Sequence, residues 1–288
     1  MDWPPDYHMH TPLCRHATGE PSAYARQARK RGLREIGFAD HAPMPRDDFD
    51  DWRMRQADLD TYLRSVEAAQ AAEPELTVRV ALEVDYLPGL EPWIEALTRR
   101  HGWDYLIGSV HYVSGGWAVD NPHQQARWQT AEPLRVWQEY LERLTAAASS
   151  GWFDVLGHVD LPKKFGPAPP PECVPLWEEL FATARRAGCA IEINTAGLRK
   201  DCREIYPSLT LLRIACRAGV PITFGSDAHA PEEVGADWSA AIALARAAGY
   251  RQYLRFAARK ACTVNLPEPT GPEKESLRKG SGPEGPQV

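Results

Sequence analysis

The sequence has no long apolar segment, no recognisable secretory leader and no paired cysteines. No window of its 288 residues approaches the roughly 18 to 20 consecutive apolar residues that cross a bilayer. The first residues, Met-Asp-Trp-Pro-Pro-Asp, lack the cationic and apolar regions of a signal peptide. The six cysteines include no C-x-x-C pair and no secreted disulfide framework. We therefore expect a cytoplasmic protein that has no membrane partner.

The sequence also lacks excess positive charge and a dinucleotide-binding motif. Its net charge of −6 gives no sign of a broad basic surface, so no nucleic-acid partner is expected. A small anionic molecule is compatible with this charge, because binding one needs only a few local cations. No G-x-G-x-x-G follows a predicted strand, which weakens the nucleotide-binding form of an open sheet.

Short apolar runs alternate along the chain with longer amphipathic stretches. Apolar residues at helical spacing predict helices over residues 22–31, 56–73, 91–100, 133–149, 174–187, 207–218 and 237–248. The apolar runs predict strands at Tyr7–His10, Glu35–Asp40, Val78–Val84, Tyr105–His111, Asp154–His158, Ala190–Asn194 and Pro221–Ser226. This alternation predicts an α/β fold with parallel βαβ units. Seven strands could close a barrel one strand short of the usual eight, or form an open doubly wound sheet.

A single domain is expected over residues 1–266, since α/β barrels often run to about 250 residues as one domain. Beyond about Pro267 the sequence consists mainly of Pro, Gly, Glu, Lys and Ser. Residues 267–288 are therefore predicted to form a disordered tail.

Most of the nine histidines lie at the ends of the predicted strands. An H-x-H ends the first strand, a D-x-H follows the seventh, and further histidines and a glutamate occupy comparable positions between them: His8, His10, His16, His41, Glu83, His111, His158, Asp227 and His229. Only His101 and His123 fall outside this pattern. Because the carboxyl ends of parallel strands share one face of the fold, we expect these side chains to converge there.

These nine side chains are predicted to bind metal ions. A single histidine at a strand end is usually a hydrogen-bonded structural residue. Seven imidazoles and two carboxylates together, however, would leave many buried polar groups without partners. Nine ligands exceed the three or four that one zinc ion takes, so two or three divalent ions are implied, with at least one bridging carboxylate. Nitrogen and oxygen ligands suit Zn, Fe or Mn, and several close cations suit hydrolysis.

This order of motifs resembles the PHP (polymerase and histidinol phosphatase) superfamily of metal-dependent phosphoesterases. The resemblance covers residues 6–265 and includes the H-x-H, the Asp-His after the second strand, the glutamate after the third and the D-x-H after the seventh. It implies the fold of that family, a distorted seven-stranded (β/α)7 barrel with the metal site at the carboxyl-terminal ends of the strands. That fold matches the number of strands predicted above.

Within the superfamily, the chain most resembles the histidinol-phosphatases of histidine biosynthesis. The matching segments are His10-Thr-Pro-Leu-Cys-Arg-His16, Gly157-His-Val-Asp-Leu-Pro-Lys-Lys-Phe165, Glu192-Ile-Asn-Thr-Ala-Gly-Leu-Arg-Lys200, Glu204-Ile-Tyr-Pro-Ser208 and Phe224-Gly-Ser-Asp-Ala-His229. The resemblance implies three ligand groups, of which the first two share Glu83: His8, His10, Glu83 and Asp227; Glu83, His111 and His158; and His16, His41 and His229.

Several cations near these motifs are candidates for binding a substrate phosphate: Arg15, Lys163, Lys164, Arg199 and Lys200. Cations in loops are usually solvated, but these follow the fifth and sixth strands or adjoin a metal ligand, on the predicted rim of the site. Arg199 suits bidentate capture of phosphate oxygens, and Lys164 suits a point-charge contact. The acidic loop Asp47–Trp52, or Trp117 with Asp120, is a candidate wall for an imidazole and an ammonium group.

The resemblance implies hydrolysis of L-histidinol phosphate, a small phosphorylated substrate, to L-histidinol and inorganic phosphate. A metal-bridged hydroxide would attack phosphorus, with Asp227, His229 and Arg199 as the catalytic side chains. The proton donor is left open between Asp40, His229 and a metal-bound water. The rival predictions are a phosphoesterase acting on nucleotides or oligonucleotide ends, a metal-dependent amidohydrolase and a non-catalytic metal-binding barrel. No oligomeric state is predicted.

Overall fold

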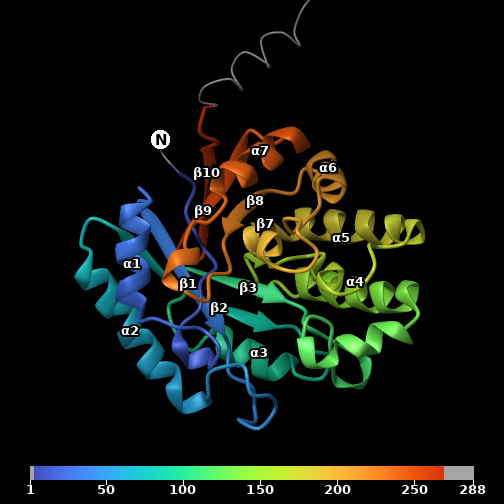
Figure 1. The fold of residues 1–288 in the computed structure, drawn as a ribbon, viewed down its shortest axis with the longest axis horizontal. Helices are drawn as coiled ribbons and strands as arrows, with labels where there is room; N and C mark the ends of the chain where they lie inside the picture. Colours follow the sequence, from blue (N-terminus) through green and yellow to red (C-terminus); the bar gives the residue numbers. More distant parts are fainter. Residues whose placement is uncertain (1–2, 269–288) are drawn as a thin grey trace, which may run out of the picture.

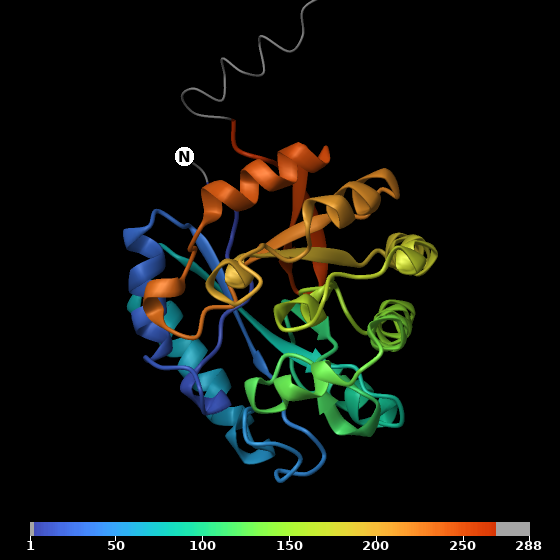
Figure 2. The same cartoon turned by 45° about the vertical axis from the view of Figure 1, so that its right-hand side comes forward.

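The computed structural model describes residues 3–268, and its centre is a curled parallel sheet. In spatial order the strands are β1 Glu35–His41, β2 Thr77–Asp85, β3 Tyr105–Ser109, β6 Val155–Leu156, β7 Ala190–Asn194 and β8 Ile222–Gly225. Figure 1 and Figure 2 show this sheet in the middle of the molecule, with helices arranged around its outside. The predicted α/β fold with parallel strands is confirmed.

The helices of the described chain lie close to the predicted ranges: α1 Pro21–Lys30, α2 Leu59–Ala72, α3 Glu91–Thr98, α4 Pro133–Ser149, α5 Val174–Ala187, α6 Leu209–Arg217 and α7 Trp238–Ala248. Their ends follow from local chemistry. The Ser208 side chain accepts a hydrogen bond from the backbone of Leu211 and caps the start of α6. Gly188 ends α5 with a φ of 73°, a conformation that glycine adopts at little cost.

The first predicted strand, Tyr7–His10, is not a strand in the structure, so the predicted count of seven strands is not confirmed. The segment lies between the two edge strands of the sheet. Tyr7 donates its backbone N–H to the carbonyl of Phe224 on β8 (3.0 Å), and Gly37 of β1 donates to the carbonyl of Asp6 (2.7 Å). The bridges nearby are isolated, Asp6 with Ile36 of β1 and Met9 with Ala228 after β8, so no continuous ladder forms with either strand.

Two antiparallel hairpins of the described chain were not predicted: β4 Tyr112–Val113 with β5 Trp117–Ala118, and β9 Gln252–Ala257 with β10 Lys260–Asn265. Leu254 and Phe256 of β9 pack inside the curled sheet against Tyr7, Ala39, Ala81, Tyr105, Ile107, Val155 and Ala190. Tyr105 and Ala190 are the first residues of β3 and β7. The hairpin therefore fills the amino-terminal end of the sheet, opposite the end that carries the histidines.

The predicted tail lies almost entirely outside the described residues. β10 ends at Asn265, and Leu266 is still buried. The division into a domain over residues 1–266 and a tail over 267–288 therefore stays a prediction. Within residues 3–268, no helix combines the length and the apolar character needed to cross a membrane.

Candidate metal centre

Glu83, near the carboxyl end of β2, lies at the centre of the predicted ligands and is 1% exposed. Its Oε2 atom lies 3.4 Å from His8 Nε2 and 2.7 Å from His41 Nδ1. Its Oε1 atom lies 2.8 Å from His158 Nε2 and 3.6 Å from His111 Nε2. Burial raises the pKa of Glu83, but the surrounding imidazoles, His41 and His8 foremost, hold that pKa well below its usual range. The ionised carboxylate faces a different group of imidazoles with each oxygen, which is the arrangement a bridging ligand needs.

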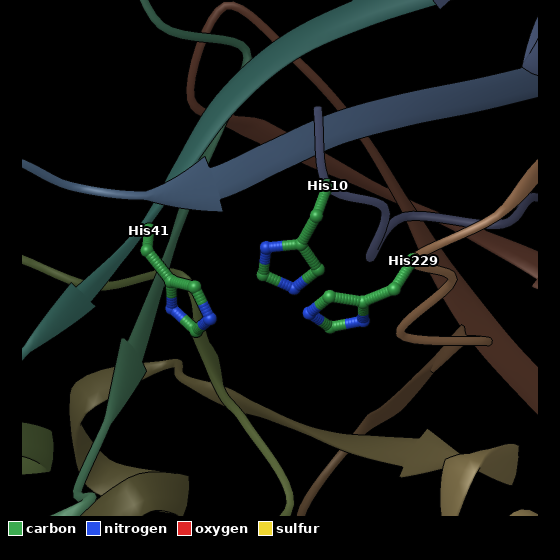
Figure 3. Close-up of side chains that lie close together, drawn as sticks. All are labelled: His10, His41 and His229. Atoms are coloured by element: carbon green, nitrogen blue, oxygen red, sulfur yellow. The ribbon is translucent and has the colours of Figure 1, made fainter. Parts of the chain in front are cut away.

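Asp227 and His229, in the turn after β8, face His10. His10 Nε2 lies 3.1 Å from Asp227 Oδ1, and the rings of His10 and His229 stack with centroids 4.1 Å apart. Figure 3 shows the rings of His10, His41 and His229 gathered around a common space. Asp227 has a φ of 53°, which is uncommon for a residue other than glycine and frequent at binding sites.

His16 joins the cluster from the rim of the site. Its ring centroid lies 4.5 Å from that of His229 and 5.5 Å from that of His41. Its Nδ1 atom lies 2.9 Å from the carbonyl oxygen of Cys14, so Nδ1 is the donor and Nε2 is left free for a ligand. The structure therefore brings together all nine side chains that the sequence predicted as ligands.

The cluster has the unpaired buried atoms that a metal site requires. Buried side-chain atoms without a hydrogen-bond partner include His8 Nε2, His41 Nδ1, Glu83 Oε2 and His229 Nε2. His41 Nδ1 is close to Glu83 Oε2, but the two atoms are not aligned as a hydrogen bond. The groups of side chains whose ligand atoms lie within 4.8 Å of one another include His8, His10 and Asp227; His8, Glu83 and His158; His10, His41 and His229; and Cys14, His16 and His229. Unpaired buried polar atoms cost free energy that cations would offset, so these residues fit a group of divalent ions.

Three buried carboxylates lie behind the imidazoles, each close to an Nδ1 atom: Glu192 to that of His8 (2.8 Å), Asp85 to that of His111 (2.8 Å) and Asp40 to that of His10 (3.3 Å). A carboxylate in this position accepts the Nδ1 proton, which leaves Nε2 free to bind a metal. The sequence analysis missed Glu192 and Asp85 as part of the site. Asp85 could have been predicted from the sequence, because Asp85 lies two residues after Glu83 and therefore points to the same face of β2.

Protons are expected to compete with metal ions for this cluster. Burial lowers the pKa of His10, but its hydrogen bond to Asp227 raises that pKa to about 9. Burial also lowers the pKa of His111, but the charge of Asp85 raises it to about 10. Burial lowers the pKa of His8 too, but the charges of Glu192 and Glu83 raise it well above its usual value. All three shifts favour the protonated imidazoles, so a metal must displace their protons.

We therefore expect the affinity for metal to rise from pH 6 to pH 9, with about two to three protons released per chain at pH 7. Calorimetric titration of metal-stripped protein with zinc, in two buffers of different ionisation enthalpy, measures this release. Identical heats in the two buffers would contradict the expectation.

The cluster opens into a pocket of about 500 Å³. Seven of the predicted ligands line it: His16, His41, Glu83, His111, His158, Asp227 and His229. Three of the candidate phosphate-binding cations also line it: Arg15, Lys164 and Lys200. The Lys164 ammonium lies 3.1 Å from Asp120 Oδ2. The pocket therefore places positive charge beside the predicted metal ligands.

Lys163 does not line the pocket, and its buried ammonium group has other partners. Its Nζ lies 2.8 Å from Asp160 Oδ2, 2.8 Å from Glu204 Oε2 and 2.8 Å from the carbonyl of Ile205. These three contacts use all three N–H donors of the ammonium. The geometry does not support the predicted contact between Lys163 and a phosphate.

Arg199 does not line the pocket either. It donates from Nη2 to the carbonyl of Ser226 (2.7 Å) and from Nε to Glu233 Oε1 (3.1 Å). Glu233 in turn accepts the backbone N–H of His229 (2.8 Å). In this geometry Arg199 braces the loop that carries Asp227 and His229, and neither its predicted phosphate contact nor its predicted catalytic role is supported.

The segments predicted to contact an imidazole are only partly at the pocket. Asp51 and Trp52, from the loop 47–52, line it, and so does Asp120. Trp117 is buried against Trp128, with ring centroids 4.8 Å apart, and does not line the pocket. His123, which the pattern of strand ends left aside, does line it. His123 reaches the pocket from the segment after β5. The spacing of apolar residues does not predict where this segment lies.

The fold and the cluster together define a class: an α/β protein that gathers histidines and carboxylates at the carboxyl ends of its parallel strands. Comparison with protein families matches residues 6–196 to the PHP domain and residues 211–241 to a PHP-associated segment. The chain belongs to the PHP family of metal-dependent phosphoesterases, as the motifs predicted.

Two curated proteins illustrate the relationship. The chain is 42% identical over 247 residues to a Deinococcus radiodurans protein named "Probable histidinol-phosphatase". The match covers 85% of this chain and 94% of that protein. It is 30% identical over 254 residues to the histidinol-phosphatase of Bacillus subtilis, across 80% of this chain and 95% of that protein.

A solved structure shares the fold. Histidinol phosphate phosphatase from Lactococcus lactis, complexed with zinc, L-histidinol and phosphate, superimposes with a TM-score of 0.78 and 21% sequence identity. The match covers 91% of this chain and all of that one. The curled α/β architecture is therefore that of a known phosphatase structure.

Proposed function

We propose that this protein is a metal-dependent phosphomonoesterase that hydrolyses L-histidinol phosphate to L-histidinol and inorganic phosphate in histidine biosynthesis. The observation that carries the proposal is the pocket, where seven of the predicted metal ligands lie beside three cations. The names of the relatives from Deinococcus radiodurans and Bacillus subtilis support the same substrate. The zinc, L-histidinol and phosphate in the Lactococcus lactis structure support it as well.

Two or three divalent ions would be held by three ligand groups: His8, His10, Glu83 and Asp227; Glu83, His111 and His158; and His16, His41 and His229. Zinc, iron and manganese all suit these ligands, and the zinc of the Lactococcus lactis protein favours zinc. When bound, such ions polarise phosphoryl oxygens and lower the pKa of water. The segment Tyr7–His10, which bonds to both β1 and β8, would act as the seventh member of a distorted barrel.

The remaining pocket residues suit a substrate that carries both signs of charge. Lys164, Arg15 and Lys200 would attract the phosphate and orient it toward the cluster. Asp51 would face the ammonium and imidazole groups of the substrate, with Asp120 beside it holding Lys164 at 3.1 Å. This combination of charges favours histidinol phosphate over a nucleic-acid end, which offers no cationic group to these carboxylates.

Asp227 and His229 would act as catalytic residues through the ions that they would hold. His229 does not suit the role of proton donor, because its Nδ1 donates to the carbonyl of Asp227 (3.0 Å) and its unpaired Nε2 is a proposed ligand atom. Asp40 does not suit this role, because it is fully buried and accepts hydrogen bonds from the Thr11 and His41 backbone N–H groups.

The test is phosphate release by purified protein loaded with zinc, manganese or iron. We expect kcat/KM for L-histidinol phosphate to exceed that for nucleoside monophosphates and phosphorylated oligonucleotide ends by about 100-fold or more. Removal of metal by a chelator should abolish turnover, and added metal should restore it. Equal or better turnover of the nucleotide substrates would favour the alternative, a PHP phosphoesterase of nucleotides or oligonucleotide ends.

A further inference from the structure

One wall of the pocket is attached to the rest of the protein through Arg53. The loop 47–53 follows β1 and presents Asp51 and Trp52 to the pocket. Arg53 is 3% exposed, and its guanidinium spans two carboxylates. Nε lies 2.7 Å from Asp50 Oδ2 in the loop, and Nη2 lies 2.9 Å from Asp85 Oδ2 on β2. Nη1 donates to the carbonyl of Ala42 (3.1 Å). These contacts fix the loop to the end of the sheet.

Asp85 is shared between Arg53 and His111. While its Oδ2 accepts from the guanidinium, its Oδ1 accepts from His111 Nδ1 (2.8 Å) and from the His111 backbone N–H (3.1 Å). His111 Nε2 then faces Glu83. One carboxylate therefore connects the cation that holds the loop with an imidazole of the proposed metal centre.

Trp52 is held by the same group of residues. The Arg53 guanidinium lies over its ring, 4.3 Å from the centroid. Tyr112 stacks on it at 5.8 Å with an interplanar angle of 18°, and the Tyr112 hydroxyl donates to Asp50 Oδ2 (2.7 Å). Trp52 in turn meets the imidazole of His111 edge-on at 5.2 Å. Movement of the loop would therefore move both a pocket wall and the surroundings of His111.

We propose that Arg53 is a positioning residue that holds the pocket wall formed by Asp51 and Trp52 in a fixed place relative to the metal-facing imidazole of His111. The inference rests on the proposed function for its substrate and adds a determinant of specificity to it. Arg53 does not line the pocket, so it acts through Asp85 and Trp52. Its planar guanidinium reaches Asp50, Ala42 and Asp85 through three different nitrogens, a spacing that the single nitrogen of a lysine does not reproduce.

The first measurement compares two substrates in the zinc-loaded Arg53→Met variant. We expect kcat/KM for L-histidinol phosphate to fall about 30-fold or more, mainly through KM, because a small displacement of a substrate-positioning wall has large effects. Glycerol 2-phosphate, which has neither imidazole nor amine, should lose about threefold or less. The ratio of kcat/KM for L-histidinol phosphate to kcat/KM for glycerol 2-phosphate separates an effect of the pocket wall from an effect on overall stability.

The second measurement is the rate at which a chelator removes zinc, which needs no substrate. Arg53→Met should lose zinc about 10-fold faster than the natural sequence, since His111 has lost part of its support. Arg79→Met is the matched control, because Arg79 also contacts two carboxylates, Glu35 at 2.9 Å and Asp104 at 3.5 Å, at the far end of the sheet. This control should lower thermal stability and leave both the ratio and the zinc loss unchanged.

Arg53→Lys decides the question if Arg53→Met does not fold, and it should show intermediate values of both measurements. A folded Arg53 variant that keeps the natural substrate ratio, or the natural rate of zinc loss, overturns the proposed coupling. If the natural protein shows no preference for L-histidinol phosphate, the proposed function fails. The zinc-loss measurement would then still test the link from Arg53 through Asp85 to His111.

Discussion

Replacement of Glu83 by glutamine is expected to remove most of the bound metal and to lower kcat/KM for L-histidinol phosphate by about 10³-fold or more. Such a loss equals about 4 kcal/mol of transition-state stabilisation. Both oxygens of Glu83 face imidazole nitrogens, His8 and His41 on one side and His111 and His158 on the other. Glutamine has the same shape but no charge, and its NH2 group cannot serve as a ligand. Both groups of imidazoles would then lose their anionic partner, and one group would face an NH2 donor in its place.

Metal content after gel filtration and steady-state kinetics at saturating zinc test this prediction together. Glu35→Gln is the matched control, because Glu35 is also a buried strand glutamate (3% exposed). It is paired with Arg79 at the opposite end of the sheet. The control should lose stability but retain its metal and its activity within about threefold. A Glu83→Gln protein with full metal content and natural kcat/KM would show that the cluster is not the active site.

The convergence of the ligands could be predicted from the sequence because it depends on topology alone. Once strands and helices alternate, every strand end lies on the same face, so His41, His111, His158 and Asp227 must meet whatever the details of packing. The helix limits were equally accessible. α4 and α5 have the predicted bounds because their apolar residues repeat at helical spacing and Gly188 ends α5.

The partners of charged side chains could not be predicted in this way. The sequence places Lys163 and Arg199 near the rim of the site, but whether they face the pocket depends on acids elsewhere in the chain. Glu204 lies 41 residues from Lys163, and Glu233 lies 34 residues from Arg199. Asp160, three residues before Lys163, is a local partner, but sequence spacing alone does not show which acids each cation meets.

The hairpin of β9 and β10 was missed for a related reason. Its first strand lacks a clean alternation, because Tyr253, Leu254 and Phe256 are all buried. Leu254 and Phe256 pack against residues of β1, β2, β3, β6 and β7. The first segment, Tyr7–His10, was predicted as a strand because an extended chain places both imidazoles of its H-x-H on one side. It lacks a ladder because its backbone hydrogen bonds are divided between β1 and β8. In both cases tertiary contacts decide what the local pattern leaves open.

Replacement of Glu192 by glutamine is the second change with a large expected effect, here on the affinity for zinc. Glu192 does not itself line the pocket. Its Oε1 lies 2.8 Å from His8 Nδ1, and its Oε2 accepts from the His158 backbone N–H (3.2 Å) and from Asn194 Nδ2 (3.0 Å). Every partner is a donor, so only a carboxylate accepts at both ends. If the glutamine NH2 group faces His8, the imidazole must carry its proton on Nε2, the atom that faces Glu83. If the NH2 group faces Asn194, two buried donors lose their acceptor.

Either orientation of the glutamine weakens His8 as a ligand, so we expect the affinity for zinc to fall about 10- to 100-fold. Activity at low zinc should fall in proportion. The decisive measurement is a zinc titration of activity, because excess zinc should restore most of the turnover of Glu192→Gln by mass action. The same excess should not rescue Glu83→Gln, whose missing oxygen is itself a proposed ligand. Natural zinc affinity in Glu192→Gln would mean that His8 does not depend on its buried carboxylate.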